Sequence, residues 1–194
     1  MTRLILKIAL LLGTTVVLLS FVTPTGWFNA GSKPKSYEMG IDKGSGQDGK
    51  NAATIKSIDK KIDGFGTLMQ QSKPDKFLGK RVRMTGFVKS ENVLNWAGIW
   101  LRVDDTGSKQ PLSFDNMSDR PIKGTTDWAK YEIVLDVPSN ASLIAYGALL
   151  GGTGQIWFDN ISFEVVGDDI PTTGSVKGKK SATQDEPTNL DFEK

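Results

Sequence analysis

Short runs of alternating apolar and polar residues fill the central part of the chain. Between residues 36 and 166 these runs are separated by Gly, Asn, Asp, Ser and Pro, the residues that form turns. A period of two indicates strands with one buried face. Segment 72–80 is the one place where we expect a helical turn. The predicted strands are 36–42, 51–59, 65–71, 81–90, 97–105, 111–117, 128–138, 142–150 and 155–166.

Short strands at this spacing, with turn signals between them, favour two antiparallel sheets packed face to face. We therefore predict an all-β fold, a two-sheet β-sandwich of the jelly-roll kind, over residues 23–166. Between residues 167 and 188 the composition changes, and the segment has neither aromatic residues nor periodicity. We expect residues 167–188 to form a flexible linker.

Two of the predicted strands, which we expect to be neighbours, divide clearly into an inner and an outer face. The inward residues are Val82, Met84, Gly86 and Val88 in the first strand and Ala97, Ile99, Leu101 and Val103 in the second. The outward face carries Arg83, Trp100 and Arg102. A Trp ring stacks on the apolar face of a pyranose and Arg binds its hydroxyls, so this face is a candidate sugar platform. The alternative is an ordinary solvated face, or a Trp100 covered by a loop.

A polar loop follows these strands and supplies two more candidate ligand contacts. Asn116 and Arg120 lie in the segment "SFDNMSDRPIKGTTDW", beside the proposed platform. The segment is either the rim of a binding site or a well-bonded turn. The predicted ligand-binding set is Arg83, Trp100, Arg102, Asn116 and Arg120.

The last predicted strand contains adjacent aromatic residues that must face opposite sides. We predict that Phe158 enters the core, which requires a bulge at Asp159, because Asn160 and Ser162 would otherwise also point inward. The alternative phase buries Trp157 instead, together with Asp159, whose carboxylate would then need a cation or hydrogen-bond donors.

The absence of two residue types limits the chemistry. The chain has no His and no Cys, which excludes disulfides, thiol nucleophiles, the usual zinc sites and the Ser-His-Asp triad. The remaining catalytic candidates are the carboxylates Asp104, Asp105, Asp115, Asp159 and Glu164, and no spacing among them matches a glucanase pattern. We predict that the protein is not an enzyme.

The charge balance of the chain is not typical of a nucleic-acid-binding protein. The chain has 24 Lys and Arg residues against 22 Asp and Glu residues, and the first 22 residues carry two of the basic ones and no acid. The remainder is electrically balanced and has no basic stripe. We therefore expect no nucleic-acid binding.

The N-terminal segment has the pattern of a targeting sequence. Arg3 and Lys7 precede an apolar run from Ile8 to Val22. Residues 1–22 are therefore predicted to be a signal peptide or an N-terminal anchor, and the protein is predicted to be extracytoplasmic: secreted, periplasmic or membrane-anchored. Membrane contact is expected only through this segment, if it is uncleaved.

Several segments together resemble the galactose-binding-like jelly-roll domains. They include "GWFNAGSKPKSYEMGID", "WAGIWLRVDD" and "GTGQIWFDNISFEVV", and the resemblance extends from Thr23 to Val166. Such domains are similar to carbohydrate-binding modules and to accessory domains of bacterial regulators and extracytoplasmic hydrolases. The resemblance implies the jelly-roll fold, and the fold alone does not specify the ligand.

The same resemblance implies a structural calcium ion. In calcium-binding members, a Glu of the opening strand, a Gly-rich loop and an Asp of the closing strand share the ion. The matching positions are Glu193, the loop "KGSGQDGKN" with Asp48, and Asp159. Oxygen ligands suit a hard cation. Without calcium, Asp48 and Asp159 would be ordinary loop and turn residues.

The C-terminal "NLDFEK", residues 189–194, resembles the strand with which such domains open, and that strand is missing before Trp27. We predict a circular permutation in which residues 189–194 pair beside residues 27–38, with Leu190 and Phe192 in the core. The alternatives are a strand donated to a neighbouring chain, the stump of a second repeat, or a free tail.

These observations predict an exported, non-catalytic binding module with carbohydrate at the cell surface as its partner. The alternative is a structural or protein-interaction accessory domain that binds a cell-surface protein and no sugar. A carboxylate-dependent glycan hydrolase is a third hypothesis.

Overall fold

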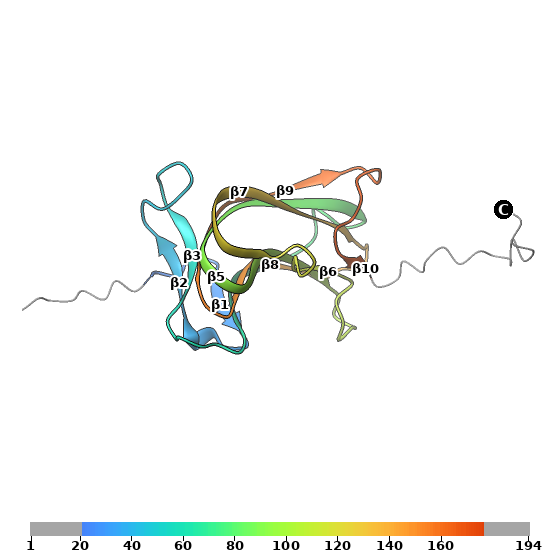
Figure 1. The fold of residues 1–194 in the computed structure, drawn as a ribbon. Helices are drawn as coiled ribbons and strands as arrows, with labels where there is room; N and C mark the ends of the chain where they lie inside the picture. The colour runs from blue at the N-terminus through green and yellow to red at the C-terminus, as the bar shows by residue number, and fades with distance from the viewer. Residues whose placement is uncertain (1–20, 177–194) are drawn as a thin grey trace, which may run out of the picture.

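The computed structural model describes residues 21–176, which form an antiparallel β-sandwich (Figure 1). The only helical element in this part is a short 3-10 turn, η1 (Pro34–Ser36). The strands are β1 (Phe28–Gly31), β2 (Tyr37–Asp42), β3 (Ala52–Ser57), β4 (Phe65–Ser72), β5 (Lys80–Asp104), β6 (Ser113–Asp115), β7 (Ile122–Val137), β8 (Leu143–Gly151), β9 (Gln155–Val166) and β10 (Ser175–Val176). The predicted fold class is confirmed.

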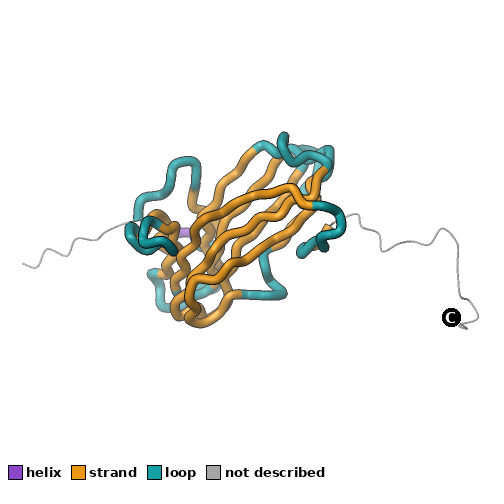
Figure 2. Tube along the Cα trace, turned by 90° about the horizontal axis from the view of Figure 1, so that it is seen from above, coloured by secondary structure: helices purple, strands orange, loops and turns teal. Residues whose placement is uncertain are grey.

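The strands form two layers that share β5. One layer, which we call layer A, has the order β1-β4-β8-β5-β6-β10, and the other, layer B, has the order β7-β5-β9-β3-β2. Figure 1 shows β7 and β9 in one layer and β8, β6 and β10 in the other. In Figure 2 the strands run side by side and loops gather at the ends of the sandwich.

The predicted strands 81–90 and 97–105 are two halves of β5 and are not neighbours, so this expectation is wrong. The first half pairs with β7 and β9 in layer B, and the second half pairs with β8 and β6 in layer A. Between the halves the pairing with β7 shifts register three times, and Asn92 has a φ of 52°. Bulges bend a strand and increase its twist, so the chain can pass from one sheet to the other.

This bend also changes which side chains of β5 enter the core. The inward residues of the first half are Val82, Met84 and Val88, and those of the second half are Ala97, Ile99, Leu101 and Val103. The inward positions are thus even-numbered before the bend and odd-numbered after it. The sequence assigned both inner faces correctly.

The predicted burial of Phe158 is confirmed, and β9 has a bulge directly after it. Three steps along β9, from Asp159 to Ser162, oppose two steps along β5, and Asn160 has a φ of 53°. Asn tolerates this left-handed conformation better than most residues. Phe158 is buried before the bulge, and Ile161 and Phe163 pack against the core after it.

The first described residues already belong to the sandwich. The backbone N–H of Ile41 donates to the carbonyl of Val22, so the predicted boundary at residue 22 falls inside a β-bridge. Residues 1–20 of the predicted signal peptide or anchor lie outside the described residues. Within the described part, no helix has the length and apolar character needed to cross a membrane.

The predicted start of the flexible linker, at residue 167, is wrong. Arg81 forms an ion pair with Asp136 and donates to the carbonyls of Asp168 and Ile170, and β10 pairs with β6. Residues 167–176 are therefore bound to the sandwich, because buried Arg81 needs acceptors that this segment provides. The rest of the predicted linker and the strand 189–194, including Glu193, lie outside the described residues.

The segment 72–80 does not form the expected helical turn. Two successive turns replace it, closed by hydrogen bonds from Phe77 N–H to the Pro74 carbonyl and from Lys80 N–H to the Phe77 carbonyl.

Tyr37 joins the two layers at one end of the sandwich. Its ring packs against Gly66, where an added Cβ would lie 2.6 Å from the ring, and its hydroxyl donates to the carbonyl of Gly152 at 2.8 Å. Only 5% of Tyr37 is exposed, and this burial raises the pKa of the phenol from 10.0 to about 12.

We predict that Tyr37 makes stability depend on pH in alkaline solution. In the unfolded chain the phenol ionises near pH 10, and in the folded chain it stays neutral until about pH 12, so its contribution is complete below pH 10 and is lost as the pH rises toward 12. At pH 8 we expect Tyr37→Phe to lower the free energy of unfolding by about 1 kcal/mol. Urea denaturation at pH 8, 10 and 11 measures the difference between the two proteins, which should shrink with pH. A difference that stays constant would contradict this role.

Candidate functional site

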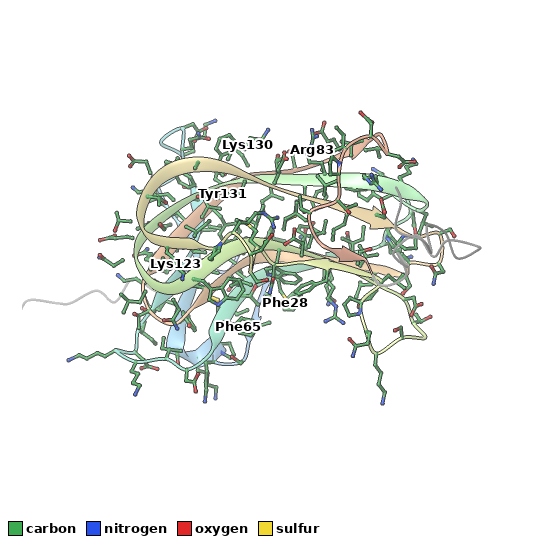
Figure 3. All side chains as sticks on the ribbon, turned by 45° about the vertical axis from the view of Figure 1, so that its right-hand side comes forward. Phe28, Phe65, Arg83, Lys123, Lys130 and Tyr131 are labelled. Carbon is green, nitrogen blue, oxygen red and sulfur yellow. The ribbon has the colours of Figure 1, made fainter. Side chains whose placement is uncertain are left out.

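The outer face of layer A contains a cleft of about 610 Å³. Outward-facing side chains of β1, β4, β8, β5 and β6 form its floor, and a small apolar cluster on this face is separate from the core. The buried members of the cluster are Met69, Trp100, Ala145 and Leu149, with Ala30, Trp96 and Phe114 packed against them. Figure 3 shows Phe65, which lines the cleft, and Phe28 on this side of the molecule. A pocket of this size is within the range of small-molecule sites.

Trp100 lies along the floor of the cleft. It sits on β5, yet its indole Nε1 donates to Oγ1 of Thr67 on β4 at 2.8 Å. Strand β8 separates β5 from β4, so the two backbones are about 10 Å apart. The indole must therefore extend along the sheet surface above β8, and for this reason only 8% of Trp100 is exposed although it lines the cleft.

Glycine residues of β8 permit this arrangement. Gly147 is the register partner of both Trp100 and Met69, and an added Cβ there would lie 2.3 Å from the Leu68 carbonyl oxygen. Gly151 is the partner of Trp96, and an added Cβ would lie 2.8 Å from its indole nitrogen. Gly151 therefore lets the Trp96 indole lie against β8, and Gly147 lets β4 approach β8 closely at the position opposite Trp100.

Sequence reasoning missed Trp96 as a site residue. Trp96, Trp100 and Arg102 all line the cleft and all occupy even positions of β5. The predicted strand started at Ala97, one residue too late. Extending the same alternation by one position would have found Trp96.

Polar side chains gather at one end of the cleft. Arg102 donates from Nε to both carboxylate oxygens of Asp104 at 2.8 to 2.9 Å, and Nη2 lies 2.8 Å from Oδ1. The side chain of Arg102 is 42% exposed and that of Asp104 is 15% exposed. Asp105 and Ser108, from the loop after β5, and Gln71 of β4 complete this end. The ion pair fixes the guanidinium of Arg102 beside the cleft and leaves some of its N–H groups accessible.

Three of the five predicted ligand-binding residues line the cleft: Trp100, Arg102 and Asn116. Arg83 does not, and its place in one platform with Trp100 is wrong. It lies in layer B, where its guanidinium is 2.8 Å from Glu164 and 3.5 Å from Glu132, and Figure 3 shows it on the opposite side from Phe28 and Phe65. The reason is the bend in β5, which separates the outer faces of its two halves.

Arg120 is also absent from the cleft lining. Its Nη2 lies 2.7 Å from buried Asp115, its Nη1 lies 2.8 Å from Asp119, and it donates to the Glu132 carbonyl. These bonds hold the loop after β6 against β7. The contacts of Arg120 therefore support the second interpretation of this segment, a well-bonded turn.

The predicted calcium ligands are only partly within the described residues. Asp48 is exposed and pairs with Lys50 at 3.0 Å, which lowers the pKa of its carboxyl. Oδ1 of Asp159 accepts from the N–H of Asn160, and its Oδ2 lies against the Gly-rich loop, 3.1 Å from where a Cβ of Gly46 would be. Residues 21–176 contain no cluster of three acidic side chains suited to a metal. Calcium binding stays a prediction.

Comparison with known sequences gives one informative relative and no family model that matches. The chain is 45% identical over 170 residues to the uncharacterized HTH-type transcriptional regulator YbfP of Bacillus subtilis (strain 168). The alignment covers 87% of this chain and 56% of the relative, so the chain spans about half of the relative's length. A helix-turn-helix needs two α-helices, and residues 21–176 contain none.

Comparison with solved structures shows the fold. The CBM22-1 xylan-binding domain from Paenibacillus barcinonensis Xyn10C has a TM-score of 0.53 at 14% identity, covering 76% of this chain and 90% of that one. The C-terminal family 22 carbohydrate binding module of Clostridium thermocellum Xyn10B has a TM-score of 0.50 at 16% identity, covering 76% and 89%. A cyclase from Fischerella sp. TAU has a TM-score of 0.50 at 14% identity, covering 75% and 87%. The described chain is thus a jelly-roll β-sandwich with the fold of the family 22 carbohydrate-binding modules, a fold that an enzyme also has.

Proposed function

We propose that the protein is a non-catalytic carbohydrate-binding module whose ligand lies in the cleft of layer A. One observation carries the proposal: two tryptophans, Trp96 and Trp100, lie against the outer face of a sheet that no other layer of the described residues covers. An apolar cluster that stays on the outside of a sheet is typical of a binding surface.

The chemistry of the cleft fits a sugar. The rings of Trp96 and Trp100 offer apolar faces for stacking, and Phe65 and Phe114 extend this surface. At the polar end, Arg102 provides N–H donors, while Asn116 and Gln71 provide both donors and acceptors for hydroxyl groups. A pyranose has both an apolar face and a polar rim, so it matches both parts of the site.

The comparisons support this proposal and also suggest the alternative of an enzyme. A cleft contributes to ligand binding in the family 22 module of Xyn10B, and the Paenibacillus domain binds xylan. The cyclase has the same fold and is an enzyme. Against catalysis, both carboxylates that line the cleft are engaged within the protein: Asp104 pairs with Arg102, and Asp105 accepts hydrogen bonds from the N–H of Gly107 and the side-chain amide of Asn140. Acid–base catalysis of glycoside hydrolysis requires a pair of carboxylates on the two sides of a bond.

Other observations support the proposed cellular location and a second candidate function. The basic and apolar pattern of residues 1–22 supports export to the cell surface. The relative described as a transcriptional regulator supports a second candidate, an accessory domain that detects a ligand or a protein for a larger assembly. The two candidates differ in whether a glycan alone binds the isolated chain.

We predict that the cleft residues, and not Arg83, determine glycan binding. On a glycan array followed by calorimetry, Trp96→Ala should weaken binding by about 1 to 3 kcal/mol because a stacking surface is lost. Trp100→Ala should weaken it at least as much, with a lower melting temperature because Trp100 is largely buried. Arg83→Ala is the matched control in layer B and should bind like the wild type. Equal affinity of Trp96→Ala, Trp100→Ala and the wild type would refute the proposed site.

We also propose that calcium stabilises the Gly-rich loop through Asp159, the described member of the predicted set that lies against this loop. Saturating calcium should raise the melting temperature of the wild type by about 5 °C relative to chelator, because a ligand that binds only the folded state stabilises it. Asp159→Asn should abolish the rise, and Asp127→Asn, an exposed control in β7, should keep it. Identical melting curves of the wild type in calcium and in chelator would disprove a structural calcium ion.

A further inference from the structure

One hydroxyl group on β4 connects the cleft floor to the backbone of β8. Oγ1 of Thr67 accepts the indole N–H of Trp100 at 2.8 Å and donates its own proton to the carbonyl of Ala148 at 2.7 Å. Thr67 is 4% exposed and Trp100 is 8% exposed. The position requires a residue that donates and accepts at one atom, so among side chains of this size only Thr and Ser are suitable.

The bond fixes the direction of the Trp100 ring. A Trp side chain rotates about two bonds, and in a shallow cleft its ring can lie along the sheet or stand away from it. The bond to Thr67 holds the ring tip at β4, two strands away from the Trp100 backbone. Gly147 adds no side chain beneath the ring. The ring is thereby kept along the sheet with one face toward the cleft.

The two tryptophans of the cleft therefore have different chemical roles. The only polar group of Trp100 is used within the protein, so this residue offers a ligand nothing but the face and edge of its ring. Within residues 21–176, Nε1 of Trp96 forms no hydrogen bond to another side chain or carbonyl. Trp96 can offer both a ring and a hydrogen-bond donor.

We propose that Thr67 is a positioning residue for ligand binding: it contributes to affinity by holding Trp100 in its stacking orientation. This inference rests on the proposed function of the cleft and goes beyond it, because it gives a binding role to a buried hydroxyl that contacts the ligand only through Trp100.

The test compares two substitutions of Thr67. Thr67→Val keeps the shape and removes the hydroxyl, and Thr67→Ser restores the hydroxyl. Calorimetry with the best glycan from the array measures affinity at a temperature at which all variants are folded. NMR measures how fast the indole N–H of Trp100 exchanges with D₂O, and Trp100→Phe identifies its signal.

Thr54 provides a matched control. It is fully buried in layer B, and its hydroxyl also donates to a carbonyl, that of Ile156, and accepts from a side chain, that of Gln155. Thr54→Val removes an equivalent pair of bonds without contact with the cleft. We expect Thr54→Val to lower the melting temperature and leave both affinity and the Trp100 exchange rate unchanged.

For Thr67→Val we expect about a fivefold to tenfold weaker affinity and at least about tenfold faster exchange of the Trp100 N–H, because a hydrogen bond of ordinary strength is lost. Thr67→Ser should restore both. Wild-type affinity in Thr67→Val, or an equal loss of affinity in Thr54→Val, would overturn the inference. If the wild type binds no glycan, the proposed function fails, and unchanged N–H exchange in Thr67→Val would separately refute the fixed orientation of Trp100.

Discussion

The structure depends on β5 belonging to both sheets. A strand of 25 residues cannot stay in one layer of so small a sandwich, so it bends near Asn92 and its inward positions change from even to odd. Because of this change, the even-numbered side chains that fill the core in layer B point out of the sandwich in layer A. Trp96, Trp100 and Arg102 come to the outer surface for this reason, while Met84 of the same strand is fully buried.

The shape of the cleft depends on strand β8, which has glycine instead of larger residues at two positions. Glycine at two outward positions of β8, Gly147 and Gly151, leaves no side chain opposite Trp100 and Trp96, so these indoles can lie beside β8, next to Ala145 and Leu149. The ring of Trp100 spans to β4 and is fixed there by Thr67. Burial of the rings against the sheet stabilises the fold, and the ring faces that remain accessible are available to a ligand. Stability and the proposed ligand binding thus depend on the same side chains.

Alternation along the chain predicts most strand segments and the inner faces of β5, because the alternation depends only on neighbouring residues. The short strands β1 and β10 are not predicted from it. Alternation also predicts that burial of Phe158 needs a bulge at Asp159, and the structure has a bulge between Asp159 and Ser162, with Asn160 at positive φ. Pairing is not local, and two separated apolar runs look alike whether they are neighbours or halves of one bent strand. Alternation alone therefore cannot separate Arg83 from Trp100. It also does not reveal that Arg81 binds the carbonyl groups of Asp168 and Ile170, because backbone carbonyls leave no side-chain pattern.

We propose that ligand binds to the outer face of layer A. The most direct measurement is an NMR map of backbone amide shifts during titration with an oligosaccharide that the protein binds. We expect the perturbed amides to lie in β4, in β8 and in the second half of β5, beside Trp96 and Trp100. Perturbations confined to layer B, around Arg83 and Glu164, would contradict it.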